Sequence, residues 1–458
     1  MTDSNEQIVV AVRTVAHLSE HFDRLKREAL QMRDTFGADE HGYLTPTQEE
    51  QVLHLIISYW YSRNALFDLI NQFFDGEEPV RDMDDRAFVL AYASAILLVD
   101  VARFLHEAFG DRAVAGKKLN HPIPEFGIPE GLYDTVQISL TSPMNAWHLH
   151  QANTVFDERA ETWRRTAAGD DIMAPVWEVI GALGERVRVS ASEYAQARLV
   201  ARGQQVVRNL GKRPVLSAMY ALQQWASEAI AGINVLPHHE PRLPRPVVEK
   251  LRALLKPGDV VINRKEFAVT NYFLPGYWPH AALYLGHVDA LRAMGLHEHK
   301  HCKPRWSRLA RVDQTDVGCV LESQKDGVQV RPINSVLHAD AIAVIRPMLS
   351  PEQLPGALAR GLSHEGKAYD FDFDFTRSDR MVCTEVVYRT YDGVGGMTFE
   401  LKRRAGSLTL AAEDLLDMAI DRRWFETLAV YAPAHRSRLL EGADAIDALR
   451  NTVGSTDS

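Results

Sequence analysis

A helical spacing of apolar positions dominates residues 1–236. The segment TPTQ at residues 45–48 combines a threonine cap, a proline for the first helical position and a glutamine that can close a capping box. Apolar side chains then recur at intervals of three and four, which places them on one face of a long helix. This stripe consists of Val52, Leu55, Ile56, Tyr59, Leu66, Ile70 and Phe73. The pattern predicts an N-terminal domain built from helices.

The pattern changes after residues 237–247, a proline-rich segment that disfavours regular helix and predicts a linker. Beyond it the chain carries short runs rich in valine, isoleucine and leucine, which are typical of β-strands. The dipeptide Asp326-Gly327 separates two of these runs and predicts a tight hairpin. The predicted strands are residues 259–263, 280–286, 318–323, 328–333 and 341–347.

Two helices are expected within or after this β region. The segment SPEQ at residues 350–353 has capping chemistry, and a second helix is predicted to start at Cys383. The tail after residue 405 has a mostly helical pattern. The fold class is therefore predicted as α+β: a helical domain (1–236), a linker (237–247), a domain with a small antiparallel sheet (248–404) and a mostly helical extension (405–458).

Composition narrows the choice of partners and compartment. The formal net charge of -10 argues against broad binding to phosphate backbones, so no nucleic-acid partner is expected. The three cysteines are too few, and odd in number, for a disulfide framework, which favours a reducing compartment. The N-terminus lacks a basic region followed by an apolar core, so we expect no signal peptide and a cytoplasmic location.

The most apolar stretch of the chain is residues 87–99. Charged residues flank it on both sides, and a helix needs about 20 apolar residues to cross a bilayer. The stretch therefore predicts a buried helix. Contact with a membrane surface stays open as an alternative.

Cys383 is the first candidate for chemistry. A thiol attacks as a thiolate, and the first turn of a helix stabilises that anion through unpaired backbone N–H groups and the helix dipole. The same amides can form an oxyanion hole. The alternative is a structural cysteine, because free cysteines are among the most buried residues.

His280 and Glu322 are the candidate partners of this cysteine. His280 begins the predicted strand 280–286, and at the end of a strand it can face a thiolate and act as general base and acid. Glu322 lies in the next predicted strand, where a carboxylate can hold the imidazole in one tautomer. The alternatives are an ordinary packed or surface histidine and an ordinary strand glutamate.

Five segments, taken in order, resemble the YiiX/YebB-like group, which are circularly permuted relatives of the NlpC-type peptidases within the papain-like fold. They are LLKPGDVVINR, TNYFLPGYWPHAALYLG, VLESQKDGVQVRPI, GKAYDFDFDF and VCTEVVY, between residues 248 and 400. The order histidine, acidic residue, cysteine is that of the permuted group. The resemblance implies a permuted papain-like domain at residues 248–404, with Cys383 as nucleophile, His280 as base and Glu322 as orienting residue.

The resemblance also implies roles for two further residues. Tyr369 matches a family tyrosine near the nucleophile, which we expect to shape the oxyanion site or to hold the cysteine loop. Thr384 follows the cysteine, as a small residue does in the group, and is a candidate substrate-binding residue. Glu385 is expected to be structural.

Tyr277 and Trp278 precede His280 and are candidates for an apolar wall of the substrate site, together with Tyr272, Phe273 and Leu274. The equal alternative is a seam of the hydrophobic core. The predicted function is hydrolysis of an amide or ester in an acylated or peptidic substrate, which is a small molecule, lipid or peptide. The open alternatives are an acyltransferase, a catalytically idle scaffold and a membrane-surface enzyme.

No cofactor is required for this chemistry, and no metal site is predicted. The cluster of histidines between His297 and Cys302 is the densest set of possible ligands. Structural zinc sites usually join two separated pairs of ligands, and nothing in the sequence supplies a second pair. The cluster is therefore interpreted as a solvated insertion. The oligomeric state is open.

Overall fold

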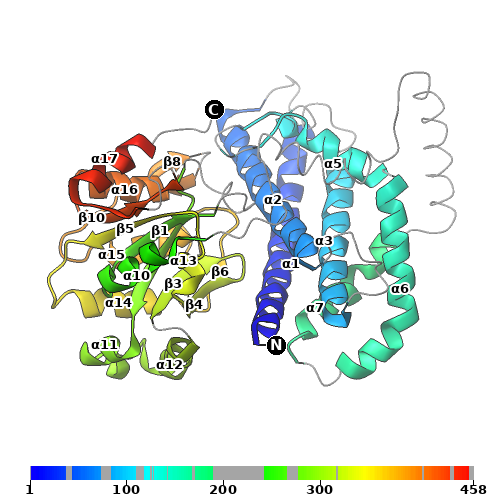
Figure 1. Cartoon of the computed structure of the whole chain (residues 1–458). Coiled ribbons are helices and arrows are strands. Elements are labelled where there is room, and N and C mark those ends of the chain that lie inside the picture. Colours follow the sequence, from blue (N-terminus) through cyan, green and yellow to red (C-terminus); the bar gives the residue numbers. More distant parts are fainter. Residues whose placement is uncertain are drawn as a thin grey trace. The chain divides into compact units, whose positions relative to one another are not determined.

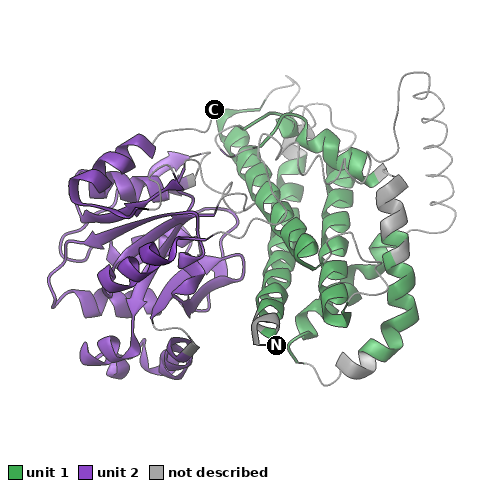
Figure 2. Ribbon diagram, in the orientation of Figure 1, with its two compact units in different colours: residues 1–124, 128–235 green, residues 125–127, 236–458 purple. Residues whose placement is uncertain are grey.

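The computed structural model divides the chain into two compact units, residues 1–124 with 128–235 and residues 125–127 with 236–458 (Figures 1 and 2). The residues described are 2–37, 44–73, 84–109, 118–123, 126, 128–141, 143–167, 171–188, 242–265, 277–315, 318–404, 407–433 and 438–452. An α+β fold with a helical N-terminal region and a C-terminal antiparallel sheet is confirmed.

The first unit is a bundle of helices. Its elements are α1 (Thr2–Gly37), α2 (Pro46–Phe73), α3 (Asp85–Phe109), α5 (Leu132–Thr141), α6 (Pro143–Ala167), α7 (Ala174–Leu183) and the short 3₁₀ turn η3 (Gly184–Val187). The predicted capping box at the start of α2 is present: the backbone N–H of Thr45 donates to the side chain of Gln48 at 2.8 Å, and the N–H of Gln48 lies 3.4 Å from the hydroxyl of Thr45.

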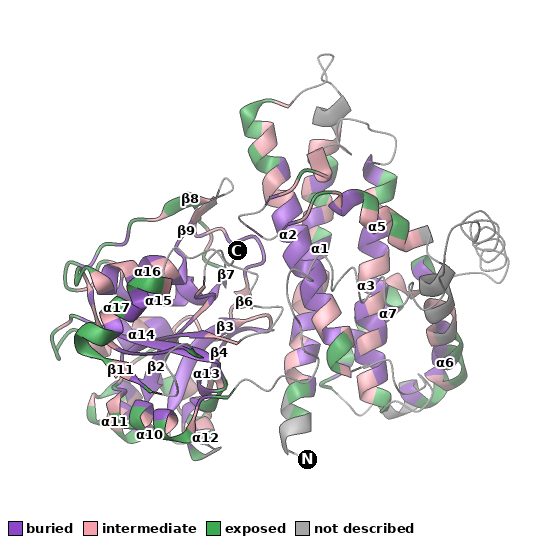
Figure 3. Cartoon of the chain, turned by 45° about the horizontal axis from the view of Figure 1, so that its top comes forward, coloured by how far each residue is buried: buried purple, intermediate pink, exposed green. Residues whose placement is uncertain are grey.

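Helix α3 contains residues 87–99 and packs against α1, α2 and α7. Among the described residues it is the one helix long and apolar enough to cross a membrane by length and composition. However, 61% of its most apolar stretch is buried inside the structure, as expected for a core helix (Figure 3).

The second unit is built on a seven-stranded sheet with the order β11-β10-β5-β1-β2-β3-β4, in which every neighbouring pair is antiparallel. Its strands are β1 (Val260–Arg264), β2 (His280–Gly286), β3 (Cys319–Gln324), β4 (Gly327–Pro332), β5 (Ala341–Pro347), β10 (Phe425–Tyr431) and β11 (Leu440–Glu441). Two small ribbons accompany it: β6 (Ala368–Tyr369) with β7 (Arg380–Met381), and β8 (Lys402–Arg404) with β9 (Ser407–Thr409).

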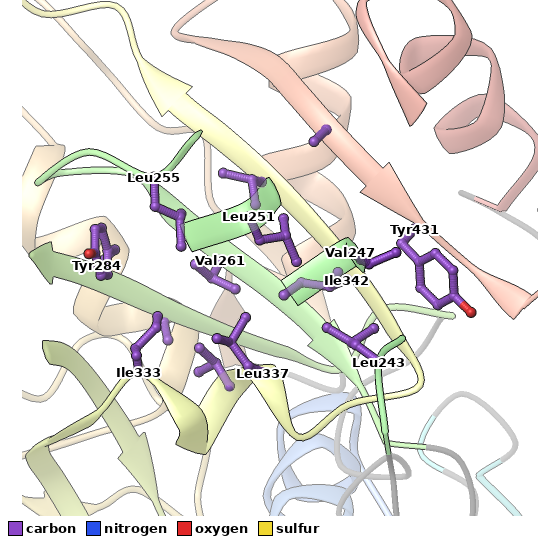
Figure 4. Packing of buried hydrophobic residues seen from close by; sticks show 14 of the residues in the cluster. Leu243, Val247, Leu251, Leu255, Val261, Tyr284, Ile333, Leu337, Ile342 and Tyr431 are labelled. Carbon is purple, nitrogen blue, oxygen red and sulfur yellow. The ribbon is translucent and has the colours of Figure 1, made fainter. Parts of the chain in front are cut away.

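Helices cover the sheet. They are α10 (Arg245–Leu254), α11 (Val288–Ala293), α12 (Trp306–Thr315), α13 (Asn334–Leu337), α14 (Leu354–Leu362), α15 (Cys383–Tyr391), α16 (Ala412–Ile420) and α17 (Gly442–Thr452), with 3₁₀ turns η5 (Leu296–Glu298) and η6 (Lys303–Arg305). Apolar side chains of α10 pack with Val261 of β1 and Ile342 of β5 in one buried cluster (Figure 4). Helix α15 packs against β2, β3 and α14.

Three predicted boundaries differ from the structure. Helix α10 begins at Arg245, inside the predicted linker 237–247, because Pro246 lies in the first turn, where no N–H is needed. The rest of that segment up to residue 241 lies outside the described residues. Helix α14 begins at Leu354, and residues 350–353 form a turn before it.

The predicted extension 405–458 also differs, because it is part of the sheet. Strand β10 pairs with β5 from Phe425 to Tyr431, with one register shift between Thr427 and Ala429, and Phe425 and Val430 are fully buried. The short run FETLAVY carries no local signal that distinguishes a strand from a buried helical segment, and its partner lies about 80 residues earlier in the chain.

Gly327 closes the β3–β4 hairpin in a conformation that glycine alone adopts easily. Its φ is 90°, and a β-carbon there would lie 2.2 Å from the backbone oxygen of Lys367. We expect Gly327→Ala to lower the free energy of unfolding by about 2–3 kcal/mol, because it adds a backbone clash to left-handed strain. Gly366→Ala is the matched control, since its φ is 91° but no atom lies within 4 Å. It should lose only about 1 kcal/mol. Equal losses in urea denaturation would contradict the role of the clash.

Candidate active site

Cys383 lies where strand β7 passes into helix α15. Val382 is extended (φ -87°, ψ 170°) and is the N-cap, without a side-chain cap, so Cys383 is the first helical residue. The strand before it is fixed by Ser323 of β3, whose hydroxyl donates to the backbone oxygen of Met381 at 2.6 Å. The side chain of Cys383 is therefore held at a helix N-terminus, where backbone amides favour an anion.

His280 begins β2, opposite Asn263 of β1. Its Nε2 lies 2.7 Å from Oε2 of Glu322, which projects from the neighbouring strand β3 and is fully buried. With Nε2 engaged by the carboxylate, Nδ1 is the ring nitrogen left for the thiol. The structure thus brings Cys383, His280 and Glu322 together from three elements.

The charges of Cys383 and His280 stabilise each other. Burial opposes both charged forms, raising the pKa of a thiol and lowering that of an imidazole. The thiolate–imidazolium attraction and the hydrogen bond between the two side chains outweigh burial, so the pKa of Cys383 falls below its usual value and that of His280 rises. The backbone N–H groups of Ala281 and Thr384 donate to the sulfur and lower the pKa of Cys383 further.

Glu322 completes a row of alternating charges. Burial raises its pKa, but the hydrogen bond from His280, the charge of His280 and the charge of Arg331 bring the pKa down to about 2. Nε of Arg331 on β4 lies 3.3 Å from Oε1 of Glu322, and the same guanidinium pairs with Asp326. The carboxylate is therefore ionised at neutral pH and faces cations on both sides.

Tyr369 lies on strand β6, which pairs with β7, the strand that leads into Cys383. Parallel pairing of β6 with β7 places it opposite Met381, two residues before Cys383. Its ring packs edge-on against Phe371 at 4.9 Å between centroids. This position is compatible with the predicted role of Tyr369 in holding the cysteine loop.

Thr384 differs from its prediction as a substrate-binding residue. Its side chain is fully buried, which argues against contact with a substrate, and its backbone N–H donates to the sulfur of Cys383. Glu385 is also fully buried and accepts a hydrogen bond from Arg389 at 2.8 Å. Burial raises the pKa of Glu385 to about 7, against the effect of Arg389.

The predicted aromatic wall is corrected at Trp278. This side chain is fully buried, and its Nε1 donates to the hydroxyl of Thr452 at 3.0 Å, so it belongs to the core. Tyr277 is partly exposed, and the guanidinium of Arg264 lies 4.6 Å from its ring centroid. Tyr272, Phe273 and Leu274 lie outside the described residues.

Two residues near the site were missed by sequence reasoning. Arg331 pairs with Glu322, and Ser323 fixes the strand before Cys383. The hairpin predicted at Asp326-Gly327 could have indicated the contact between Arg331 and Glu322. Its register places Arg331 opposite Val320, and Val320 and Glu322 lie on the same face of β3. No local pattern indicates the contact of Ser323 with a strand 58 residues later.

Within the described ranges, no group of three or more histidine, cysteine or acidic side chains has the geometry of a metal site. In the cluster between His297 and Cys302, the thiol of Cys302 is buried, and burial raises its pKa to about 11. The rings of His299 and His301 lie 5.5 Å apart between centroids.

The sequence model of a protein family matches residues 254–422. The family is described as permuted papain-like amidase enzymes, YaeF/YiiX, C92 family. The match covers Cys383, His280 and Glu322 in the order expected for a permuted chain. No curated protein and no solved structure matches the chain significantly.

Proposed function

We propose that the protein is a cysteine hydrolase that cleaves an amide or ester bond through an acyl intermediate on Cys383, and the match of residues 254–422 to the sequence model of the permuted papain-like amidases supports this proposal. The observation that carries the proposal is the row Cys383–His280–Glu322, with the cysteine at the start of α15. Nucleophile, base and orienting carboxylate are the parts that covalent acyl transfer needs.

In the first half-reaction, the sulfur of Cys383 forms a bond to the substrate's carbonyl carbon, and the carbonyl oxygen becomes an anion. The backbone N–H of Cys383, at the first helical position, is available to stabilise that oxyanion. The tetrahedral intermediate collapses with loss of the amine or alcohol, which takes the proton of the His280 imidazolium. The product of this step is a thioester on Cys383.

In the second half-reaction, neutral His280 removes a proton from a water molecule that attacks the thioester carbonyl. Collapse releases the carboxylic acid and restores the thiolate beside a protonated His280. Glu322 stabilises the imidazolium in both halves, and its hydrogen bond to Nε2 keeps Nδ1 directed at the reacting atoms. An acceptor amine or alcohol in place of water would make the same site an acyltransferase.

The proposal is tested by trapping the acyl-enzyme. We expect a panel of p-nitrophenyl esters of increasing chain length to give a burst of nitrophenol, and acid quenching followed by peptide mass spectrometry to find the acyl group on Cys383. Cys383→Ala should show neither the burst nor the adduct. A folded wild-type protein that forms no Cys383 adduct with any ester, and reacts with iodoacetamide no faster at Cys383 than at Cys302, would refute the proposal.

A further inference from the structure

The buried carboxylate of Glu322 lies between two cationic side chains from the strands that flank β3. Its Oε2 lies 2.7 Å from Nε2 of His280 on β2, and its Oε1 lies 3.3 Å from Nε of Arg331 on β4. Glu322 is fully buried and the side chain of Arg331 is 12% exposed, so solvent screens these charges little. The negative charge of Glu322 is therefore shared between an imidazole that titrates during catalysis and a guanidinium that stays charged.

The β3–β4 hairpin holds Arg331 in this place. Arg331 lies opposite Val320 in the register of the two strands, and Val320 and Glu322 share one face of β3. The guanidinium also forms an ion pair with Asp326, a fully buried residue in the turn of the same hairpin. The register and this ion pair together keep the guanidinium beside Glu322.

Other charged groups lie near this pair, and they differ in what happens to them during the reaction. In the resting site the thiolate of Cys383 also faces His280. Burial lowers the pKa of Lys265, which directly follows β1, while the charges of Glu322 and Asp340 raise it. Formation of a thioester on Cys383 removes the thiolate but none of these other charges. Among the described residues, the carboxylate of Glu322 is then the anion that contacts His280.

The second half-reaction limits how tightly Glu322 can hold the imidazolium. His280 acts as base towards water in its neutral form, so it must not regain a proton from solvent after it has given one to the leaving group. A buried carboxylate that faced His280 alone would favour the imidazolium. We propose that Arg331 is a positioning residue of the second half-reaction: by sharing the charge of Glu322, it lets His280 stay neutral in the acyl-enzyme. This role rests on the proposed function.

The first test measures the protonation of His280 without a substrate. Cys383→Ala removes the thiolate, as acylation does, and the ring resonances of ¹⁵N-labelled histidine, assigned by their loss in His280→Ala, report the titration. We expect Arg331→Met, made in the Cys383→Ala protein, to raise the pKa of His280 by about one unit, because it removes the cation on the far side of Glu322. Arg331→Lys keeps the charge and should give a smaller shift.

Arg346→Met is the matched control for the loss of a buried ion pair. Arg346 lies on β5, which is adjacent to neither β2 nor β3, and its Nε lies 2.7 Å from the buried carboxylate of Asp259. Asp259 precedes β1, whereas His280 lies opposite Asn263 towards the other end of that strand. The titration of His280 should therefore not change in this variant.

A second variant keeps the test decisive if Arg331→Met does not fold because Asp326 is left as an unpaired buried charge. Arg331→Met combined with Asp326→Asn removes both members of that ion pair and leaves the pair of His280 and Glu322 in place. It should raise the pKa of His280 in the same direction by a smaller amount. A folded Arg331 variant without charge in which His280 titrates as in its parent overturns the proposal.

The second test uses the acyl-enzyme formed from a p-nitrophenyl ester. Arg331→Met should shift the acidic limb of deacylation to higher pH, because His280 then keeps its extra proton longer. Iodoacetamide labelling of free Cys383 should instead begin at lower pH, since the imidazolium is more stable, which is the opposite of the shift expected for Glu322→Gln. A loss of stability alone moves neither limb. A deacylation limb that stays in place refutes the role of Arg331, whereas a wild type that forms no acyl-enzyme refutes the proposed function itself.

Discussion

Alanine in place of His280 is expected to slow the reaction of Cys383 with iodoacetamide at pH 6 by about a hundredfold or more. Burial raises the pKa of Cys383, and the imidazolium of His280 is the main cause that lowers it; without His280, only the backbone N–H groups of Ala281 and Thr384 oppose burial. Each unit by which the thiol pKa rises above the pH removes about nine-tenths of the remaining thiolate, so two units suffice for the stated loss. Peptide mass spectrometry across pH measures the rate at each cysteine.

The sign of the pH dependence follows from both shifts. In the wild type, the labelling rate should rise at a pH below the usual range of thiols, since the pKa of Cys383 is lowered and that of His280 is raised. In His280→Ala, the rise should move to alkaline pH. Cys302 is an internal reference in both proteins, because burial raises its pKa to about 11.

His287→Ala is the matched control for this experiment. His280 is the first residue of β2, and His287 directly follows the last. The side chain of His287 caps the N-terminus of helix α11. The His287→Ala substitution removes an imidazole at the other end of the same strand and leaves the surroundings of Cys383 unchanged, so the labelling profile should not change. A similar slowing in both variants would mean that the effect comes from disturbance of β2 and not from the ion pair.

The candidate site residues were assigned mainly through the resemblance to a family, because local signals alone left a structural cysteine, an ordinary histidine and an ordinary strand glutamate open as alternatives. The predicted strand-to-helix junction made Cys383 a candidate, and α15 begins at that residue. The two-residue alternation along the segment VLES predicts that Glu322 and Val320 lie on the same face of their strand. In the structure this strand, β3, pairs with β2, which begins with His280. Such signals use periods of two residues and capping chemistry, which the sequence alone displays.

The missed features depend on contacts between distant segments. Strand β10 is recognisable only through its pairing with β5, and Ser323 only through its bond to Met381. Trp278 illustrates a different difficulty. An apolar aromatic side chain has the same sequence signature in a substrate wall and in a core, and only its burial and its bond to Thr452 distinguish the two.

Glutamine in place of Glu322 is expected to lower kcat by about two to four orders of magnitude, by analogy with the loss of the orienting carboxylate in serine hydrolases. The carboxylate has a pKa of about 2 and is ionised throughout an assay near neutrality. An amide keeps the shape but not the charge, and it can present its N–H₂ to Nε2, which favours the wrong tautomer. The imidazolium is then less stable, so the pKa of His280 falls and that of Cys383 rises. The acidic limb of kcat/KM and of iodoacetamide labelling should therefore shift to higher pH.

Asp326→Asn provides the matched control for that shift. Asp326 and Glu322 both pair with Arg331, but only Glu322 contacts His280. Loss of the Asp326 charge should affect thermal stability and leave the acidic limb in place, whereas Glu322→Gln should move the limb even where both variants have the same Tm. An unchanged limb in Glu322→Gln, with a fall in kcat no larger than that of Asp326→Asn, would mean that Glu322 is a structural partner of Arg331. In that case His280 would act as the base without an orienting carboxylate.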